Sequence, residues 1–128
     1  MKNNDISSFY ETEIETGFSV LRIKNGTEVV LKKKHPVNQE VIQFHFCLKG
    51  QTNFIFNEGN YTFQVLEDHS MLLYNPQKAL PIEVELSTDT WMVSILISIT
   101  KFHSLFSSDA DHISCLLYTS DAADDLGR

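Results

Sequence analysis

The sequence predicts an all-β domain of about eight strands that ends in a short helix. Three observations lead to this fold class. Runs of alternating apolar and polar residues recur roughly every ten residues, a spacing typical of barrels and sandwiches. Turn-forming Asn, Asp, Gly and Pro residues separate these runs. After Thr100 the apolar residues Phe102, Leu105 and Phe106 change to the spacing of an amphipathic helix.

The expected strands follow one another with recognisable turns. A first pair flanks the segment KNGT, residues 24–27, which carries a hairpin signal. A second pair flanks Asn57–Asn60, where Asn and Gly tolerate the positive φ of a tight reversal. The last strand alternates large apolar residues along one face and is predicted to be central. The expected strands are 18–23, 28–33, 41–48, 52–56, 61–66, 71–75, 82–86 and 91–99.

Size and charge exclude several classes of function. With 128 residues, 42% of them hydrophobic, the chain provides one core rather than two. Its formal net charge of −7 argues against binding of nucleic acid or an anionic membrane by this stretch itself. No segment approaches the roughly 20 apolar residues of a membrane span, and the N-terminus lacks the apolar core of a secretory signal. We therefore expect a cytoplasmic protein with no membrane partner.

Both ends of the chain are expected to lie outside the domain proper. Residues 1–16 are polar and predict a flexible N-terminal arm, which leaves residues 17–113 for the barrel. Residues 114–128 lack the alternation that precedes them and run into an acidic, Ala-rich end. Their "LLYTSDAAD" resembles translated sequencing-adapter read-through. We expect this tail to be non-native and the natural sequence to continue differently after Ser114.

One stretch resembles a known family. The segment "IQFHFCLKGQTNFIFNEGNYTFQVLEDHSMLLYNP" places Gly50, Gly59, Asp68 and Pro76 in a distinctive order. In that order it resembles the cupin core of the N-terminal effector-binding and dimerisation domain of AraC/XylS-type bacterial transcription regulators. The resemblance covers residues 18–113 and implies a cupin-like double-stranded β-barrel, or jelly roll, with a short C-terminal helix.

The resemblance also implies a function. The barrel would bind a small-molecule effector of unknown identity and form a homodimer, and DNA would be bound only through a C-terminal helix-turn-helix domain that this chain lacks. Two other interpretations stay open: a stand-alone small cupin that binds a metabolite or acts as a metal-free enzyme, and an interaction barrel that only dimerises. A ligand that binds the folded state must raise its stability, which separates these cases.

No metal, cofactor or catalytic set is expected. Metal-bearing cupins, by the same resemblance, place a Glu seven residues before the strand-ending Gly and two His separated by one residue before it. Here the position seven residues before Gly50 is Gln43, and the five His residues are scattered singly. The sequence also lacks a nucleophile elbow and an obvious acid/base pair of carboxylates. We therefore expect a binding protein rather than an enzyme.

The orientation of the strand at 41–48 is ambiguous. Alternate residues of a strand face opposite sides of the sheet. The resemblance turns one set of side chains into the barrel, whereas hydrophobic alternation turns the other set inward. The first set is Gln43, His45 and Cys47, and the second is Phe44, Phe46 and Leu48.

Four residues are candidate ligand contacts: Gln43, His45, Phe56 and Tyr61. Small-molecule sites are mostly apolar with a few placed polar groups, which Gln43, His45 and Tyr61 can supply. A barrel filled by its own side chains, without a cavity, is equally compatible with the sequence. The aromatic residues of the hairpin at 52–66 are expected to be chiefly core.

Overall fold

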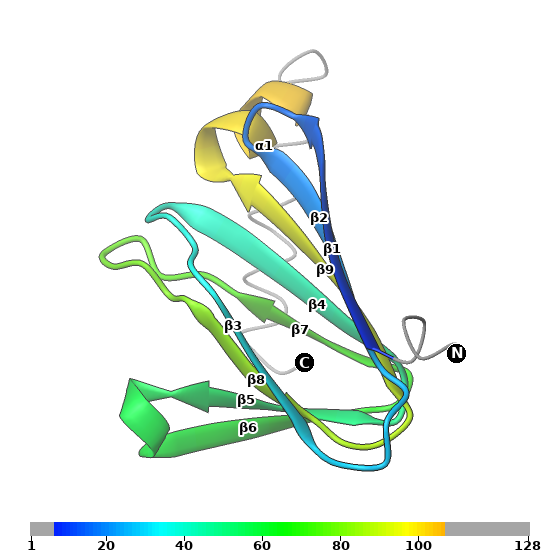
Figure 1. The fold of residues 1–128 in the computed structure, drawn as a ribbon. Coiled ribbons are helices and arrows are strands. Elements are labelled where there is room, and N and C mark those ends of the chain that lie inside the picture. The colour runs from blue at the N-terminus through cyan, green and yellow to red at the C-terminus, as the bar shows by residue number, and fades with distance from the viewer. Residues whose placement is uncertain (1–6, 107–128) are drawn as a thin grey trace.

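The computed structural model of the chain describes residues 7–106. Within that range the backbone forms nine strands, one 3-10 helix and one α-helix. The strands build two antiparallel sheets that face each other (Figure 1). The predicted all-β fold with a short terminal helix is confirmed. No helix of the described residues is long and apolar enough to cross a membrane.

The first sheet has five strands with β9 at its centre. The order is β1–β2–β9–β4–β7, and β9 pairs with both β2 and β4. The central position predicted for this strand is therefore confirmed. The helix α1 (Ile99–Phe106) follows β9 directly. The strands of this sheet are β1 (Ser7–Glu15), β2 (Phe18–Asn25), β9 (Thr90–Ser98), β4 (Val41–Lys49) and β7 (His69–Leu73).

The second sheet has four strands in the order β3–β8–β5–β6. Its strands are β3 (Leu31–His35), β8 (Ile82–Leu86), β5 (Gln51–Phe56) and β6 (Tyr61–Leu66). The predicted hairpin of β5 and β6 is confirmed, and the 3-10 helix η2 (Asn57–Gly59) makes its turn. All three residues of η2 have positive φ, as the turn chemistry required. Figure 1 shows this hairpin diverging from β8 toward η2.

The core lies between the two sheets and comes from alternate residues of most strands. On β9 the inward side chains are Met92, Ser94 and Leu96, whereas Val93 and Ile95 are half-buried on the outer face. Strand β4 likewise turns its polar set inward. Ten residues form the main apolar cluster: Leu21, Ile23, Cys47, Phe54, Val65, Ile82, Val84, Leu86, Met92 and Leu96.

The expected N-terminal arm is corrected for residues 7–15, which form β1 along the whole of β2. Charged residues such as Glu11 and Glu13 suggested a loose segment, but an edge strand of a sheet accommodates charges because one side of it stays in water. Phe9 is half-buried and packs against the core cluster, which anchors this strand. Residues 107–128, including the expected non-native tail, lie outside the described residues.

The hairpin expected around residues 24–27 is also corrected. Strands β2 and β3 lie in different sheets, so the segment between them is a crossover rather than a hairpin turn. Its Asn25 is fully buried and its side-chain amide donates to the carbonyl oxygens of Val29 and Leu86 at 2.9 and 3.1 Å. The side chain thus ties one sheet to the other. The expected strand at 28–33 correspondingly begins later, at Leu31.

The aromatic residues of the β5–β6 hairpin divide between core and surface. Phe54 is 1% exposed, as expected for core, and Phe56 is half-buried. Tyr61 and Phe63 are 59% and 43% exposed, so the expectation that they are core is corrected. Tyr61 lies opposite Phe56, beyond the end of the pairing with β8, and Phe63 lies on β6, the edge strand of the second sheet, which has no neighbouring strand on its outer side.

Candidate ligand-binding site

A cleft opens where the second sheet splits. Strands β5 and β8 pair over only three positions, from Thr52 opposite Leu86 to Phe54 opposite Val84. Beyond this point the strands separate and leave a cleft of about 710 Å³ between them. The pairing ends at Val84, three residues after Pro81, which immediately precedes β8. The missing N–H of Pro81 limits how far β8 itself can extend toward its N-terminus.

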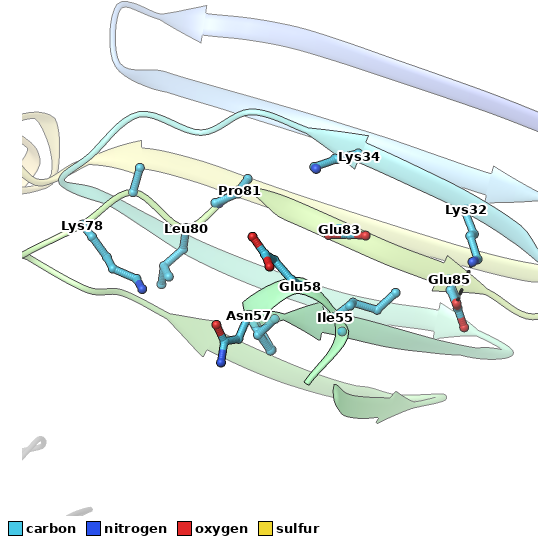
Figure 2. A pocket seen from close by; sticks show the side chains of 13 residues that line it. Lys32, Lys34, Ile55, Asn57, Glu58, Lys78, Leu80, Pro81, Glu83 and Glu85 are labelled. Carbon is cyan, nitrogen blue, oxygen red and sulfur yellow. Dashed lines mark ion pairs between the residues drawn. The ribbon is translucent and has the colours of Figure 1, made fainter. Parts of the chain in front are cut away.

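The cleft has an apolar base and a charged rim. The apolar lining comes from Ile55, Phe56, Ala79, Leu80 and Pro81. The charged lining comes from Lys32, Lys34, Lys78, Glu58, Glu83 and Glu85. Figure 2 shows these groups contributed by β3, β8, η2 and the segment before β8. The volume falls within the roughly 300–1,000 Å³ of small-molecule sites, and the mixed lining is typical of them.

Behind the base of the cleft lies a buried polar network. The Gln43 Nε2 donates to the carbonyl oxygen of Leu80 at 2.6 Å, and the Gln43 Oε1 lies 2.7 Å from the His45 Nε2. The His45 Nδ1 lies 2.6 Å from the Ser94 Oγ. Gln43, His45 and Ser94 are at most 1% exposed. The network therefore connects the wall of the cleft with the central strands of the first sheet.

The chemistry of the partners fixes the direction of each hydrogen bond. An amide oxygen only accepts, so the proton between Gln43 and His45 is on His45 Nε2. A neutral imidazole then has Nδ1 free to accept, and Ser94 donates its hydroxyl proton there. Burial lowers the pKa of His45 to about 3, which keeps the ring neutral, as this tautomer requires. Every polar atom of the His45 ring thus has a partner.

The structure places the four predicted contact residues in three different settings. Gln43 and His45 are hydrogen-bonded to each other in the interior, so the inward face of β4 is the polar one. Phe56 lines the cleft. Tyr61 is exposed on β6, and its ring centroid lies 5.9 Å from that of Phe56. Of the four residues, only Phe56 lines the cleft directly. Gln43 is connected to it through its hydrogen bond to the carbonyl of Leu80, which lines the cleft.

Sequence reasoning missed most of the cleft. Glu83 and Glu85 alternate with apolar residues, and the lysines of β3 form a short basic run, so both patterns are typical of a solvated strand face. The alternation does not reveal that the two strands lie side by side next to a split. The sequence carries no signal for the end of the β5–β8 pairing at Val84.

The residues at the position where metal-bearing cupins, by resemblance, hold their metal do not fit a metal ion. Both ring nitrogens of His45 are engaged, one as donor and one as acceptor, and neither is free to ligate. Gln43 contributes a neutral amide whose oxygen already accepts a hydrogen bond from His45. Among residues 7–106, no three His, Cys, Asp or Glu side chains converge on a point suited to a metal. Cys47 is buried beside this network, and burial raises the pKa of its thiol, which keeps it protonated.

No family model and no curated protein matches the chain. Solved structures do resemble it. An RmlC-like cupin protein from Desulfovibrio desulfuricans aligns with a TM-score of 0.56 at 14% identity, over 73% of this chain and 84% of that one. An HTH_3 family transcriptional regulator from Vibrio cholerae aligns with a TM-score of 0.54 at 14% identity, over 72% of this chain. The chain spans about half, 51%, of that regulator's length.

A third similar structure is the Cupin_2 domain of an XRE family transcriptional regulator from Enterobacter cloacae. It aligns with a TM-score of 0.52 at 9% identity, over 73% of this chain and 97% of the domain. Neither of these two regulators is described as AraC type, so the AraC/XylS assignment stays a prediction. At such low identities the likenesses establish architecture alone: the two antiparallel sheets form a cupin fold.

Proposed function

We propose that this chain is the effector-binding module of a bacterial transcription regulator and that the effector binds in the cleft between β5 and β8. The observation that carries the proposal is the split of the second sheet, which opens a cleft of about 710 Å³ beside the apolar core. The AraC/XylS resemblance supports the regulatory role, and two regulators contain a similar fold. DNA contact belongs, on this proposal, to a separate domain.

The wall of the cleft offers a way to transmit binding. The segment 78–81 lines the cleft, and the Leu80 carbonyl accepts a hydrogen bond from buried Gln43. A ligand that moves this segment changes the acceptor of Gln43 and, through His45, the setting of Ser94 on β9. Occupancy of the cleft would thus change the hydrogen bonds of Gln43, His45 and Ser94, and Ser94 lies on the central strand of the first sheet.

We propose binding rather than catalysis for this site. Proton transfer is most efficient when the pKa of the catalytic group lies near the working pH. His45, the one fully buried imidazole among the described residues, has a pKa lowered to about 3 by burial and has both nitrogens engaged. The three carboxylates at the cleft come from a turn, which carries Glu58, and from the outward face of β8, which carries Glu83 and Glu85.

A metabolite panel followed by thermal unfolding tests the effector site. A ligand at 100 times its Kd stabilises the folded state by about 2.7 kcal/mol, which raises the melting temperature measurably. Ala79→Trp fills the cleft and is expected to remove the shift. Thr88→Trp, at an exposed turn between β8 and β9, is the matched control and should keep it. A panel without any shift, or a shift that survives Ala79→Trp, contradicts the proposal.

The regulatory role has its own test. Recovery of the source gene and sequencing after the codon for Ser114 is expected to show about 100 further residues with two helix-turn-helix patterns. A reading frame that stops at residue 128 with the same tail contradicts the regulator and favours a stand-alone binding module. This outcome leaves ligand binding in the cleft unaffected, so the two halves of the proposal are tested separately.

We further propose that two copies pair through the outer face of the first sheet. Leu48, Leu72 and Trp91 on this face are 49%, 61% and 46% exposed, and large exposed apolar patches mark interaction surfaces. Phe44, Phe46, Val93 and Ile95 extend the patch between them. Sedimentation is expected to give a dimer for the native chain and a monomer for Leu72→Lys. A native monomer at tens of micromolar contradicts this pairing.

A further inference from the structure

The charges around the cleft balance, but not all of them are paired. Three lysines and three glutamates line it. The Lys32 Nζ lies 3.5 Å from the Glu85 Oε2, so these two residues form an ion pair. The other four, Lys34, Lys78, Glu58 and Glu83, form no ion pair with any residue of the described range. Two cations and two anions are therefore available to a ligand in the same hollow.

These four charges surround the apolar base from different elements. Lys34 on β3 and Glu83 on β8 are cross-strand neighbours. Glu58 belongs to η2, where its φ of 57° is one that few residues other than glycine adopt. Lys78 comes from the segment before β8. In Figure 2 the Leu80 side chain lies between those of Lys78 and Glu58.

The balance of charge restricts what the cleft can bind. A ligand with only negative groups, such as a sugar phosphate, would meet the unpaired carboxylates of Glu58 and Glu83. A ligand with only positive groups would meet the ammonium groups of Lys34 and Lys78. Charge-assisted hydrogen bonds are about twice as strong as neutral ones. A ligand that carries one carboxylate and one ammonium group uses both signs and repels neither.

The base of the cleft adds an apolar requirement. Ile55, Phe56, Leu80 and Pro81 present carbon surface below the charged rim. A compact zwitterion with an apolar side chain matches both layers. Its carboxylate is placed toward the lysines, its ammonium group toward the glutamates, and its side chain on the base. Free α-amino acids with aliphatic or aromatic side chains are the simplest compounds of this kind.

We propose that the cleft between β5 and β8 binds a zwitterionic ligand of the amino-acid class, with one lysine of the lining, Lys34 or Lys78, facing its carboxylate and one glutamate, Glu58 or Glu83, facing its ammonium group. This inference rests on the proposed function, whose effector it specifies. Leu80 is the residue that such a ligand covers, and its carbonyl is the acceptor of Gln43. The same contact therefore reports occupancy to the interior.

Calorimetric titration with a matched set of compounds tests the ligand class. The apolar amino acids leucine, methionine and phenylalanine are titrated first. The best binder is then compared with its amide, which lacks the carboxylate, and with its N-acetyl derivative, which lacks the ammonium group. Each derivative is expected to bind at least tenfold more weakly. Equal affinity for the amino acid and either derivative overturns the proposal.

Charge-removing variants test the residues. Of Glu83→Gln and Glu58→Gln, the variant that removes the carboxylate facing the ammonium group is expected to weaken binding of the amino acid tenfold while leaving the weak binding of its N-acetyl derivative unchanged. Lys49→Gln, which removes a charge from an exposed pair with Asp89 elsewhere on the barrel, is the control and should change affinity less than twofold. Melting temperatures show that each variant is folded. An unchanged affinity in both Glu variants overturns the assignment of the ammonium site.

The outcomes also separate this inference from the function on which it rests. If neutral sugars or inorganic phosphate bind in the cleft and amino acids do not, the ligand class is wrong and the effector site stands. If no compound of any class binds, both proposals fail. Amino-acid binding that persists in Ala79→Trp places the ligand elsewhere and overturns the site.

Discussion

The two ends of the barrel bury polar groups for different purposes. At the closed end, where β5 and β8 are paired, Asn25 donates to the carbonyl oxygens of Val29, Leu86 and Ser87. At the open end, Gln43 makes a single side-chain contact with the 78–81 segment, at Leu80. Several bonds fix a loop in one place, whereas one bond leaves it able to respond. The number of side-chain hydrogen bonds to each loop therefore differs between the closed end and the end proposed to bind the effector.

The closed end is further held by hydroxyl groups. The Thr90 Oγ1 donates to the Gln51 carbonyl oxygen at 3.1 Å and lies 2.8 Å from the Ser87 Oγ. The Ser87 backbone N–H also donates to Gln51. These bonds join the turn between β8 and β9 to the start of β5. The cost of opening this end is spread over many contacts, and we expect mutations there to change stability rather than ligand affinity.

The largest expected effect comes from core aromatic residues on either side of the split. Phe54→Ala removes a ring that is 1% exposed and is expected to destabilise the protein by about 3–5 kcal/mol. Phe56→Ala removes a half-buried ring at the cleft and should cost about 1–3 kcal/mol, with a larger loss of ligand affinity. Urea unfolding of both variants checks this. Equal losses of stability would remove the distinction between the ends.

Two glycines provide the next comparison. Gly50 and Gly59 both have positive φ, which costs an alanine about 1–2 kcal/mol. A Cβ at Gly50 would lie 2.9 Å from the Asp89 carbonyl oxygen and the Thr90 Cα, whereas one at Gly59 meets nothing within 4 Å. Gly50→Ala is therefore expected to lose at least about 3 kcal/mol of stability, because the clash adds to the cost of positive φ. Gly59→Ala should lose only the cost of positive φ, about 1–2 kcal/mol. Thermal unfolding of the two variants decides, and a Gly59→Ala loss as large as that of Gly50→Ala contradicts the comparison.

The titration of His45 gives a comparison that depends on pH. Its pKa is about 3 in the folded state and near 6.5 when unfolded, so between these values the unfolded chain binds the extra proton. Stability is therefore complete above pH 6.5 and falls as the pH is lowered toward 3, by up to about 1.4 kcal/mol per unit. His45→Gln should remove this component of the pH dependence. Identical pH profiles for both proteins would show that His45 does not contribute.

Local alternation predicted most of the strands because it depends on residues next to one another in sequence. The bounds of β6 and β8 were predicted to the residue, and β4 and β9 within one residue at each end. The inward face of β4 was not decided, because both of its faces are covered to some degree. Phe44 and Phe46 are half-buried on the outside, so hydrophobicity does not mark the interior there.

The site depends on relations that alternation does not contain. Glu83 meets the cleft because β8 separates from β5, two strands about 30 residues apart in sequence. Gln43 and Leu80 meet because the first sheet folds over the second. The sequence offered Gln43 and His45 as candidate ligand contacts and left the orientation of their strand open, and the structure buries both side chains in the interior. The hydrogen bond between Gln43 and His45, and their bonds to Leu80 and Ser94, could be found only from the tertiary structure.

The amide of Gln43 has a further consequence for how barrels of this kind can diverge. Its nitrogen donates to Leu80, and its oxygen accepts from His45. Gln43→Glu would exchange that nitrogen for an oxygen, place a carboxylate against a carbonyl, and release the 78–81 segment. The same exchange would supply the acidic group that metal-bearing cupins, by resemblance, hold at this position. A single atom, the amide nitrogen of Gln43 or the oxygen that replaces it in glutamate, thus decides between two roles for this position. The amide nitrogen donates to the Leu80 carbonyl, whereas the oxygen would be a ligand for a cation. One side chain cannot do both.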